Sequence, residues 1–312
     1  MRLRGIDYGP IWAASGSRGF FGEGYWFHRF VPSLEGLTFV AKTVTLSNNP
    51  GNMELEGTSW QPTERLPKCI KVDLRKGIAI NAVGLSNFGI ARALAKGAWQ
   101  RRTEPFMLSF MPISRSAEDR LAETAAYLSH LRDALPLFRA PLALQVNLSC
   151  PNTGEDLRQL EEEAADILRI LSRLDIPLLP KFNVLTAPET VARLHERVPI
   201  DGVCISNTIP YGLLKEKIEW ERMFGAVSPL AGLGGGGLSG APLLPLVREW
   251  VAHARRIGLP LPINAGGGIL HPAHVRQLFK AGADSVSVAS VIMLRPWRLP
   301  SIIREAERHR FL

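Results

Sequence analysis

The sequence predicts an α/β fold, a single (β/α)8 TIM barrel with an inserted hairpin and irregular segment between strands 2 and 3. Three observations lead to this prediction. Short apolar runs alternate with amphipathic stretches of helical period, the pattern of a parallel sheet with crossover helices. There are eight such runs, and polar or glycine-rich segments follow most of them. The 312 residues, 46% of them hydrophobic, can bury one large core, so we expect one domain spanning residues 1–312.

The apolar runs give the strands in chain order. We expect strands at residues 11–14, 38–43, 105–111, 142–146, 178–182, 202–206, 261–264 and 285–288. Amphipathic stretches, several of them preceded by residues that favour a helix start, predict helices at 117–134, 158–174, 187–197, 241–257, 272–281 and 300–308. The stretch 46–96 lacks this alternation and contains a predicted hairpin at 70–83, with its turn at Arg75-Lys76-Gly77.

Composition excludes several classes of protein. The net charge is +8, but the basic residues are scattered and lack the interleaved aromatic residues of a nucleic-acid surface, so we expect no nucleic acid as a partner. No segment reaches about 18 uninterrupted apolar residues, and the first eight residues contain no apolar signal core. We therefore expect a cytoplasmic protein with no transmembrane segment. The three cysteines are widely spaced, which predicts neither a disulfide framework nor a metal site.

A thiol between two amides follows the strand predicted at 142–146. The run is Asn147-Leu148-Ser149-Cys150-Pro151-Asn152. An isolated cysteine is often a small hydrophobic residue under a loop. Asparagine carries two donors and an acceptor, so two asparagines beside one thiol match a planar ring of alternating carbonyl and N–H groups. Chemistry at strand ends is what a (β/α)8 barrel provides.

This run resembles the active-site loop of the dihydroorotate dehydrogenases, in the class 1 form that has Cys as the base. The resemblance covers residues 10–296. It implies a step of pyrimidine biosynthesis, in which Cys150 takes the C5 proton of dihydroorotate while a hydride passes from C6 to FMN. It also implies that Asn147 and Asn152 hold the pyrimidine ring.

Other segments extend the resemblance to the substrate. Residues 81–89 resemble the substrate loop of the family, and residues 203–208 resemble its Asn-Thr strand end. Taken alone, the first of these segments is an ordinary glycine-rich loop. The resemblance assigns substrate contacts to Asn81, Gly84, Leu85, Asn147, Asn152, Asn207 and Thr208.

Two lysines close predicted strands, Lys42 in the second and Lys181 in the fifth. A lysine in a buried strand is costly to desolvate unless it meets an anion, so we expect Lys42 to face flavin and substrate, with a catalytic role. By resemblance, Lys181 lies beside the flavin N1/O2 edge. The resemblance assigns further flavin contacts to Ala14, Ser15, Gly16, Lys42, Thr43, Asn147 and Ser206.

Two glycine-rich segments predict a phosphate site. The run 234–240 leads into a helix, and Gly266-Gly267-Gly268 follows the seventh strand. Backbone amides of such loops bind phosphate without a charged side chain, and barrels carry that site after strands seven and eight. By resemblance, the FMN phosphate is bound by Gly240, Gly267, Gly268, Ala289 and Ser290.

The sequence leaves the electron acceptor open. The resemblance allows a homodimer that uses fumarate, or a chain that reaches NAD through an iron–sulfur and FAD subunit. Two other functions remain: an FMN oxidoreductase acting on another dihydropyrimidine-like ring, and a non-catalytic flavin-binding scaffold subunit.

Overall fold

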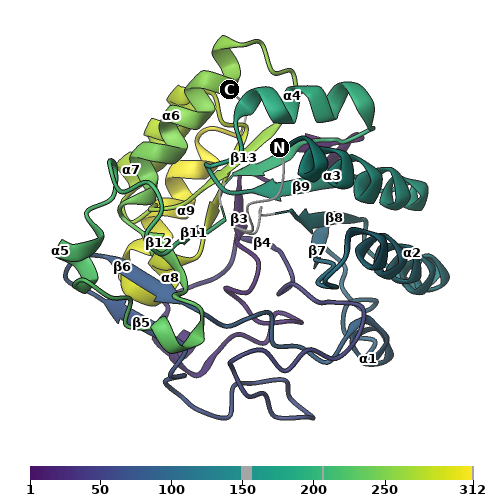
Figure 1. Cartoon of the computed structure of the whole chain (residues 1–312), viewed down its shortest axis with the longest axis horizontal. Helices are drawn as coiled ribbons and strands as arrows, with labels where there is room; N and C mark the ends of the chain where they lie inside the picture. Colours follow the sequence, from purple (N-terminus) through teal and green to yellow (C-terminus); the bar gives the residue numbers. More distant parts are fainter. Residues whose placement is uncertain (149–156, 206, 311–312) are drawn as a thin grey trace.

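The computed structural model describes residues 1–148, 157–205 and 207–310, so the predictions at Cys150, Asn152 and Ser206 lie outside the described residues. Eight parallel strands surround the centre of the molecule (Figure 1) in the order β4-β3-β14-β13-β10-β9-β8-β7. Their bounds are Ile11–Ala13 (β3), Thr38–Phe39 (β4), Phe106–Phe110 (β7), Leu142–Asn147 (β8), Leu178–Phe182 (β9), Val203–Ile205 (β10), Ile263–Gly266 (β13) and Ser285–Val288 (β14).

The first and last strands of this order meet through two parallel bridges, Val40 with Met107 and Val44 with Phe110, which close the barrel. All eight predicted strands are confirmed in their predicted places. The second is shorter than expected, because after Phe39 the chain touches β7 only at these two bridges. Pro180 does not interrupt β9, where it lies opposite Val146 of β8.

Helices cover the outside of the barrel (Figure 1). The six predicted helices are confirmed as α2 (Ala117–Ala134), α3 (Leu157–Leu171), α4 (Pro188–Arg197), α6 (Leu243–Arg256), α7 (Pro272–Ala281) and α9 (Leu299–Glu307). Three short helices were not predicted: α1 (Ile90–Ala95), α5 (Trp220–Phe224) and α8 (Ser290–Leu294). Single 3-10 turns add η1 (Trp26–Phe30), η2 (Leu135–Leu137), η3 (Ser172–Leu174), η4 (Ala231–Leu233) and η5 (Pro296–Arg298).

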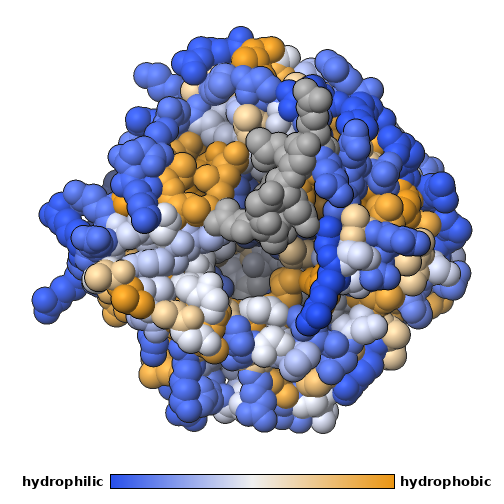
Figure 2. All heavy atoms as spheres, viewed as in Figure 1, coloured by the Kyte–Doolittle hydropathy of each residue, from blue (hydrophilic) through white to orange (hydrophobic). Residues whose placement is uncertain are grey.

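Two apolar layers stabilise the barrel. The larger lies between strands and helices, and hydrophilic side chains cover most of the margin of the face seen in Figure 2. The smaller lies inside the barrel and contains Leu3, Tyr8, Trp12, Val40 and Met107. The hairpin of β1 (Arg2–Leu3) and β2 (Ile6–Asp7) contributes to this inner layer. Side chains therefore fill the amino end of the barrel, and the carboxyl ends of the strands are left for a site.

A second, antiparallel sheet has the order β11-β12-β6-β5, with bounds Ile209–Pro210 (β11), Gly237–Gly240 (β12), Ile78–Asn81 (β6) and Ile70–Asp73 (β5). The predicted hairpin and its turn are confirmed as β5 and β6. The prediction for the glycine run 234–240 was wrong in part, because its last four residues form β12 rather than a loop. A Cβ at Gly240 would lie 2.2 Å from the carbonyl oxygen of Gly77, so glycine is needed here for close strand packing.

Candidate functional site

A cavity of about 1020 Å³ lies between the carboxyl ends of the barrel strands and the small sheet. This volume is at the upper end of the range of about 300–1,000 Å³ for small-ligand sites. Every described residue that the sequence analysis assigned to the site lines it: Ala14, Ser15, Gly16, Lys42, Thr43, Asn81, Gly84, Leu85, Asn147, Lys181, Asn207, Thr208, Gly240, Gly267, Gly268, Ala289 and Ser290. The structure thus brings together residues from nine separate segments of predicted strand ends and loops into one site.

Both lysines of the cavity, Lys42 and Lys181, are half-buried. The ammonium of Lys42 donates to the carbonyl oxygen of Ser86 (2.6 Å) and lies 4.5 Å from the centre of the Phe20 ring. Burial lowers the pKa of Lys42 from 10.5 to about 7, and burial also lowers the pKa of Lys181. Within the described part of the chain, neither ammonium has a carboxylate at ion-pair distance. Two half-buried ammonium groups with no counterion among the described residues favour an anionic ligand in the cavity.

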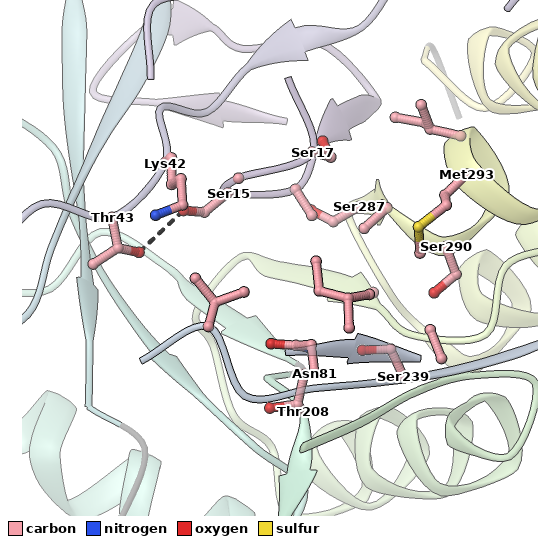
Figure 3. A pocket seen from close by; sticks show the side chains of 18 of the residues that line it. Ser15, Ser17, Lys42, Thr43, Asn81, Thr208, Ser239, Ser287, Ser290 and Met293 are labelled. Atoms are coloured by element: carbon pink, nitrogen blue, oxygen red, sulfur yellow. Dashed lines mark hydrogen bonds between the residues drawn. The ribbon is translucent and has the colours of Figure 1, made fainter. Parts of the chain in front are cut away.

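Amide side chains from different elements face the same cavity. Asn147 ends β8, and its Oδ1 accepts a hydrogen bond from Nδ2 of Asn207 (2.6 Å). Asn81 ends β6. In Figure 3 the side chains of Asn81, Thr208 and Ser239 lie on one side of the cavity, across from those of Lys42 and Ser15. Amide donors and acceptors from three separate elements therefore line the cavity.

A chain of hydroxyl groups lies beside Lys42. Ser15 Oγ donates to the carbonyl oxygen of Ala41 (2.8 Å) and lies 3.1 Å from Thr43 Oγ1 (Figure 3), which is 2.8 Å from Ser109 Oγ. These bonds join the ends of β3, β4 and β7. They fix the strand ends that carry Ser15 and Lys42.

Four polar residues inside the barrel that were not predicted as site residues also line the cavity: Gln145, Cys204, Asn264 and Ser287. Gln145 Nε2 donates to Cys204 Sγ (3.2 Å), while Oε1 of the same side chain is buried without a partner. The alternation of a strand could have identified Gln145, because it lies two residues before Asn147 and so points to the same side of β8. Cys204 is buried, and it also lines the cavity.

Backbone segments pack closely at the end of the cavity that Gly267 and Gly268 line. Gly268 has a φ of +72°, and a Cβ there would lie 2.8 Å from the amide nitrogen of Leu244, at the start of α6. The next loop residues are fixed by His274 of α7, whose Nδ1 is 3.2 Å from the amide nitrogen of Leu270 and 3.0 Å from the carbonyl oxygen of Gly268. This loop and the start of α8 at Ser290 bring backbone N–H groups to one end of the cavity.

The segment 81–89 is fixed by asparagines to which the sequence analysis gave no role. Asn87 is 1% exposed; its Oδ1 accepts from the amide nitrogen of Gly89 (2.8 Å), and its Nδ2 donates to the carbonyl oxygen of Leu85 (2.7 Å). Asn49 Nδ2 donates to the carbonyl oxygen of Gly84 (2.8 Å). Leu85 has a φ of +57°, which is uncommon for a leucine. These bonds stabilise the unfavourable backbone of a segment that lines the cavity.

Aromatic and apolar side chains form another part of the cavity wall, among them Tyr25, Trp26, Phe27, Met53 and Met293. Among the described residues, no group of three or more His, Cys, Asp or Glu side chains is arranged to hold a metal ion. None of the described helices is long and apolar enough to span a membrane.

A closed parallel barrel, with lysines, amides and glycines around one cavity at its strand ends, is the arrangement of a (β/α)8 barrel enzyme. Comparison with protein families identifies the family to which the chain belongs. The family model described as dihydroorotate dehydrogenase matches residues 3–309. The chain therefore belongs to the dihydroorotate dehydrogenase family, a family of oxidoreductases.

Relatives named for two different electron acceptors, NAD(+) and fumarate, are about equally similar to this chain. The catalytic subunit of dihydroorotate dehydrogenase B (NAD(+)) from Anoxybacillus flavithermus is 28% identical over 304 residues, 95% of this chain and 85% of that protein. Dihydroorotate dehydrogenase A (fumarate) from Lactobacillus delbrueckii subsp. bulgaricus is 27% identical over 297 residues, 93% of this chain and 86% of that protein. A crystal structure of dihydroorotate dehydrogenase from Eimeria tenella in complex with ferulenol has a TM-score of 0.66 at 19% identity, covering 99% of this chain and 82% of that one. This last similarity concerns the fold.

Proposed function

We propose that this chain oxidises dihydroorotate to orotate in pyrimidine biosynthesis, with FMN as its cofactor and Cys150 as the base that takes the C5 proton. The observation that carries the proposal is the pair of half-buried lysines, Lys42 and Lys181, which have no carboxylate partner among the described residues and lie in a cavity also lined by four asparagines. A planar ring that bears a carboxylate and imide groups offers both the negative charge and the hydrogen-bonding groups that this wall requires.

The residues present fit an FMN. Gln145 Oε1 is a buried acceptor without a partner on the cavity wall, and an N–H of the flavin ring would satisfy it. Gly267 and Gly268 line the cavity together with Ser290 at the start of α8, and backbone N–H groups of this loop and helix start would bind the phosphate. Lys181 would stabilise negative charge on the ring. When bound, the flavin would supply the hydride acceptor of the reaction.

In the proposal, Cys150 takes the C5 proton of dihydroorotate. Cys150 follows Asn147, the last residue of β8, by three positions. A thiol with a pKa of about 8.5 is largely protonated at neutral pH and needs activation before it acts as a base. In the proposal, Asn147 and Asn207 orient the ring, and Lys42 binds its negative charge.

The test compares wild type, Cys150→Ser and Cys150→Ala in anaerobic reduction of the bound flavin by dihydroorotate across pH. Loss of a general base reduces the rate by roughly 10²–10⁴-fold. We expect Cys150→Ala to be nearly inactive and Cys150→Ser to be slow, with its rate rising toward higher pH. Both variants should retain FMN, because the residues proposed to bind it lie elsewhere in the chain. Equal rates for all three proteins would refute the role of the thiol.

For the acceptor, we propose two candidates, matching the two kinds of relatives: fumarate, used by a homodimer, or NAD reached through an iron–sulfur and FAD subunit. Reoxidation of the dihydroorotate-reduced protein by fumarate or by NAD, each added alone, separates them. Rapid reoxidation by fumarate supports the homodimer. Failure with both acceptors, followed by recovery with NAD on adding such a subunit, supports the second candidate.

A further inference from the structure

Two arginines from distant parts of the chain lie against one buried aromatic ring outside the cavity. The guanidinium carbon of Arg102 is 4.2 Å from the centre of the Phe39 ring, and that of Arg18 is 5.9 Å from the same centre. Phe39 is 1% exposed, and both arginines are half-buried. We propose that Arg18 and Arg102 together bind a doubly charged oxyanion, either inorganic phosphate or a phosphate monoester, at a site separate from the flavin cavity.

The hydrogen bonds of this pair are incomplete. In the part of the chain that the structure describes, the Nε atoms of both arginines are buried and have no partner. Nη1 of Arg102 donates one long bond to the carbonyl oxygen of Phe21 (3.3 Å). Glu23 of the same segment is engaged elsewhere, because its carboxylate accepts from the amides of Phe20 (3.0 Å) and Phe21 (2.7 Å). The two guanidinium groups therefore have donors left for a ligand.

The charges of the pair are also unbalanced. Burial lowers the pKa of both arginines, and the charge of Arg18 lowers that of Arg102 further. No carboxylate of the described residues contributes to either pKa. Burial lowers the pKa of His28 as well, and the charge of Arg18 adds to this effect. An aromatic ring attracts a cation but supplies no negative charge, so the repulsion between the two arginines remains.

This imbalance indicates the class of ligand. Arginine stays charged when it is partly buried, so the pair carries two positive charges at neutral pH. An anion with two negative charges neutralises both, whereas a carboxylate leaves one unpaired. Guanidinium groups also bind the oxygens of a phosphate through pairs of parallel hydrogen bonds. Phosphate therefore matches the pair both in charge and in geometry.

The proposed site adjoins the cavity but does not belong to it. Ser15, Gly16 and Ser17 line the cavity (Figure 3 labels the two serines), and Arg18 is the next residue of the chain. Neither Arg18 nor Arg102 lines the cavity. Arg102 comes from the connection between α1 and β7. An anion held by both arginines would join this connection to the segment that follows β3.

The first test is calorimetric titration of FMN-saturated protein with inorganic phosphate, so that the loop proposed for the FMN phosphate is already filled. Arg18→Gln and Arg102→Gln should each raise the dissociation constant of phosphate about tenfold or more, because each removes a charge-assisted hydrogen bond. Arg101→Gln is the matched control, since it removes the same charge from an exposed neighbour of Arg102 and should leave this constant unchanged. Arg18→Lys and Arg102→Lys keep the charge without the fork and should give intermediate values.

The second test defines the ligand. Inorganic phosphate should bind at least about tenfold more tightly than acetate, which carries a single charge. Ribose 5-phosphate that binds as tightly as inorganic phosphate supports a site open to a monoester, and binding of inorganic phosphate alone supports a site for the free ion. Lys42→Gln should bind phosphate as wild type does, because Lys42 lies in the cavity.

Thermal unfolding gives an independent readout. Phosphate at about 100 times its dissociation constant should raise the Tm of wild type and of Arg101→Gln, and should raise that of the two glutamine variants distinctly less. If a glutamine variant does not fold, the corresponding lysine variant replaces it in both measurements.

Four outcomes overturn the proposal: a wild-type protein that does not bind phosphate, equal affinity for phosphate and acetate, loss of phosphate binding in Lys42→Gln, and a dissociation constant that no variant of either arginine changes. In the last case Arg18 and Arg102 would serve only to pack against Phe39. Each of these outcomes leaves the oxidation of dihydroorotate untouched, because the flavin reduction assay measures that reaction separately.

Discussion

Lys42 shows how burial sets the chemistry of a single side chain. Desolvation lowers its pKa to about 7, so near neutral pH the ammonium of the unliganded cavity is partly deprotonated. An anion that binds beside Lys42 favours the charged form and therefore raises this pKa again. Above pH 7, binding of such an anion must be accompanied by uptake of a proton, which makes affinity depend on pH.

The first prediction concerns orotate binding to the FMN-loaded protein. The dissociation constant should be constant below about pH 7 and rise above it, by up to about tenfold per pH unit. Titration of the flavin absorbance with orotate from about pH 6 to about pH 9 measures this slope. Lys42→Gln should bind orotate more weakly throughout and without this slope. A wild-type affinity that stays flat over the whole range would show that Lys42 does not contact the anion.

His274 contacts the loop at Gly268 and Leu270, and the proposal gives it no contact with the flavin ring. Its Nδ1 lies within hydrogen-bonding distance of Leu270 and Gly268, both of the loop proposed to bind the phosphate. An asparagine side chain places a polar atom near the position of Nδ1, whereas leucine fills the space without one.

The second prediction follows from this difference. His274→Leu should weaken FMN binding by about tenfold, since a buried loop group loses its partner, and His274→Asn should recover much of the affinity. Quenching of FMN fluorescence on binding to the apoprotein gives both constants. Equal losses in the two variants would mean that the imidazole serves only to fill space.

At the scale of elements, the small sheet depends on glycines at its strand crossings. Gly240 has a φ of +103°, and a Cβ there would lie 2.2 Å from the carbonyl oxygen of Gly77 and 2.9 Å from Cα of Ile78. Both neighbours are backbone atoms, which cannot move aside without shifting β6. Because β6 ends at Asn81 on the cavity wall, strain at Gly240 reaches the site.

The third prediction is that Gly240→Ala lowers the free energy of unfolding by roughly 2–4 kcal/mol and reduces the FMN content of the purified protein. Gly232→Ala is the matched control, because a Cβ at Gly232 meets no atom within 4 Å. Denaturant unfolding of both variants measures the difference. Similar stability of the two variants would contradict the close approach of β12 and β6.

The segment 81–89 is a second element held by particular side chains. Asn87 donates to the carbonyl oxygen of Leu85 and accepts from the amide of Gly89, and these bonds hold the left-handed backbone conformation of Leu85. Truncation of Asn87 removes both bonds and leaves the carbonyl oxygen of Leu85 only the longer bond from Asn49 Nδ2 (3.1 Å).

The fourth prediction is therefore that a variant of Asn87 weakens substrate binding and leaves FMN binding nearly unchanged. Asn87→Ala should raise the KM for dihydroorotate about tenfold or more, while FMN binding changes little, because the glycine loop lies at another end of the cavity. The exposed Asn48 provides the control variant, Asn48→Ala. Steady-state kinetics on proteins of equal flavin content check this. An unchanged KM would show that the segment keeps its shape without the amide.

At the scale of the whole molecule, one cavity joins the barrel to the small sheet, so a ligand that fills it contacts both. Binding to the folded state alone stabilises a protein by about 2.7 kcal/mol at a ligand concentration 100 times the dissociation constant. The flavin should therefore couple barrel and small sheet in unfolding.

The fifth prediction compares two flavins on the apoprotein. Excess FMN should raise Tm by several degrees, about 2–4 °C per kcal/mol for a chain of this size. Riboflavin, which lacks the phosphate, should raise it distinctly less, because the glycine loop then has no anion to bind. Thermal unfolding of the two mixtures measures the difference. Identical shifts would place the phosphate outside the loop at Gly267 and Gly268.

Much of this architecture could be predicted from the sequence. Apolar runs of strand length and amphipathic helices depend on local periodicity, so β9, β14, α2 and α7 fall where the residue pattern places them. Residues at strand ends, such as Lys42, Asn147 and Lys181, share one cavity because parallel strands of a barrel present their carboxyl ends to one side. The periodicity and order of these residues in the chain were sufficient for both conclusions.

Tertiary structure alone decided the rest. The run Gly237–Gly240 became a strand because β6, more than 150 residues earlier in the chain, offers it an edge, and no local pattern encodes that partner. The depressed pKa of Lys42 arises from desolvation by residues distant in sequence. The roles of Gln145, Asn87 and His274 likewise depend on contacts across elements. Local periodicity determines which elements form, whereas packing between distant segments determines burial, hydrogen-bond partners and charge.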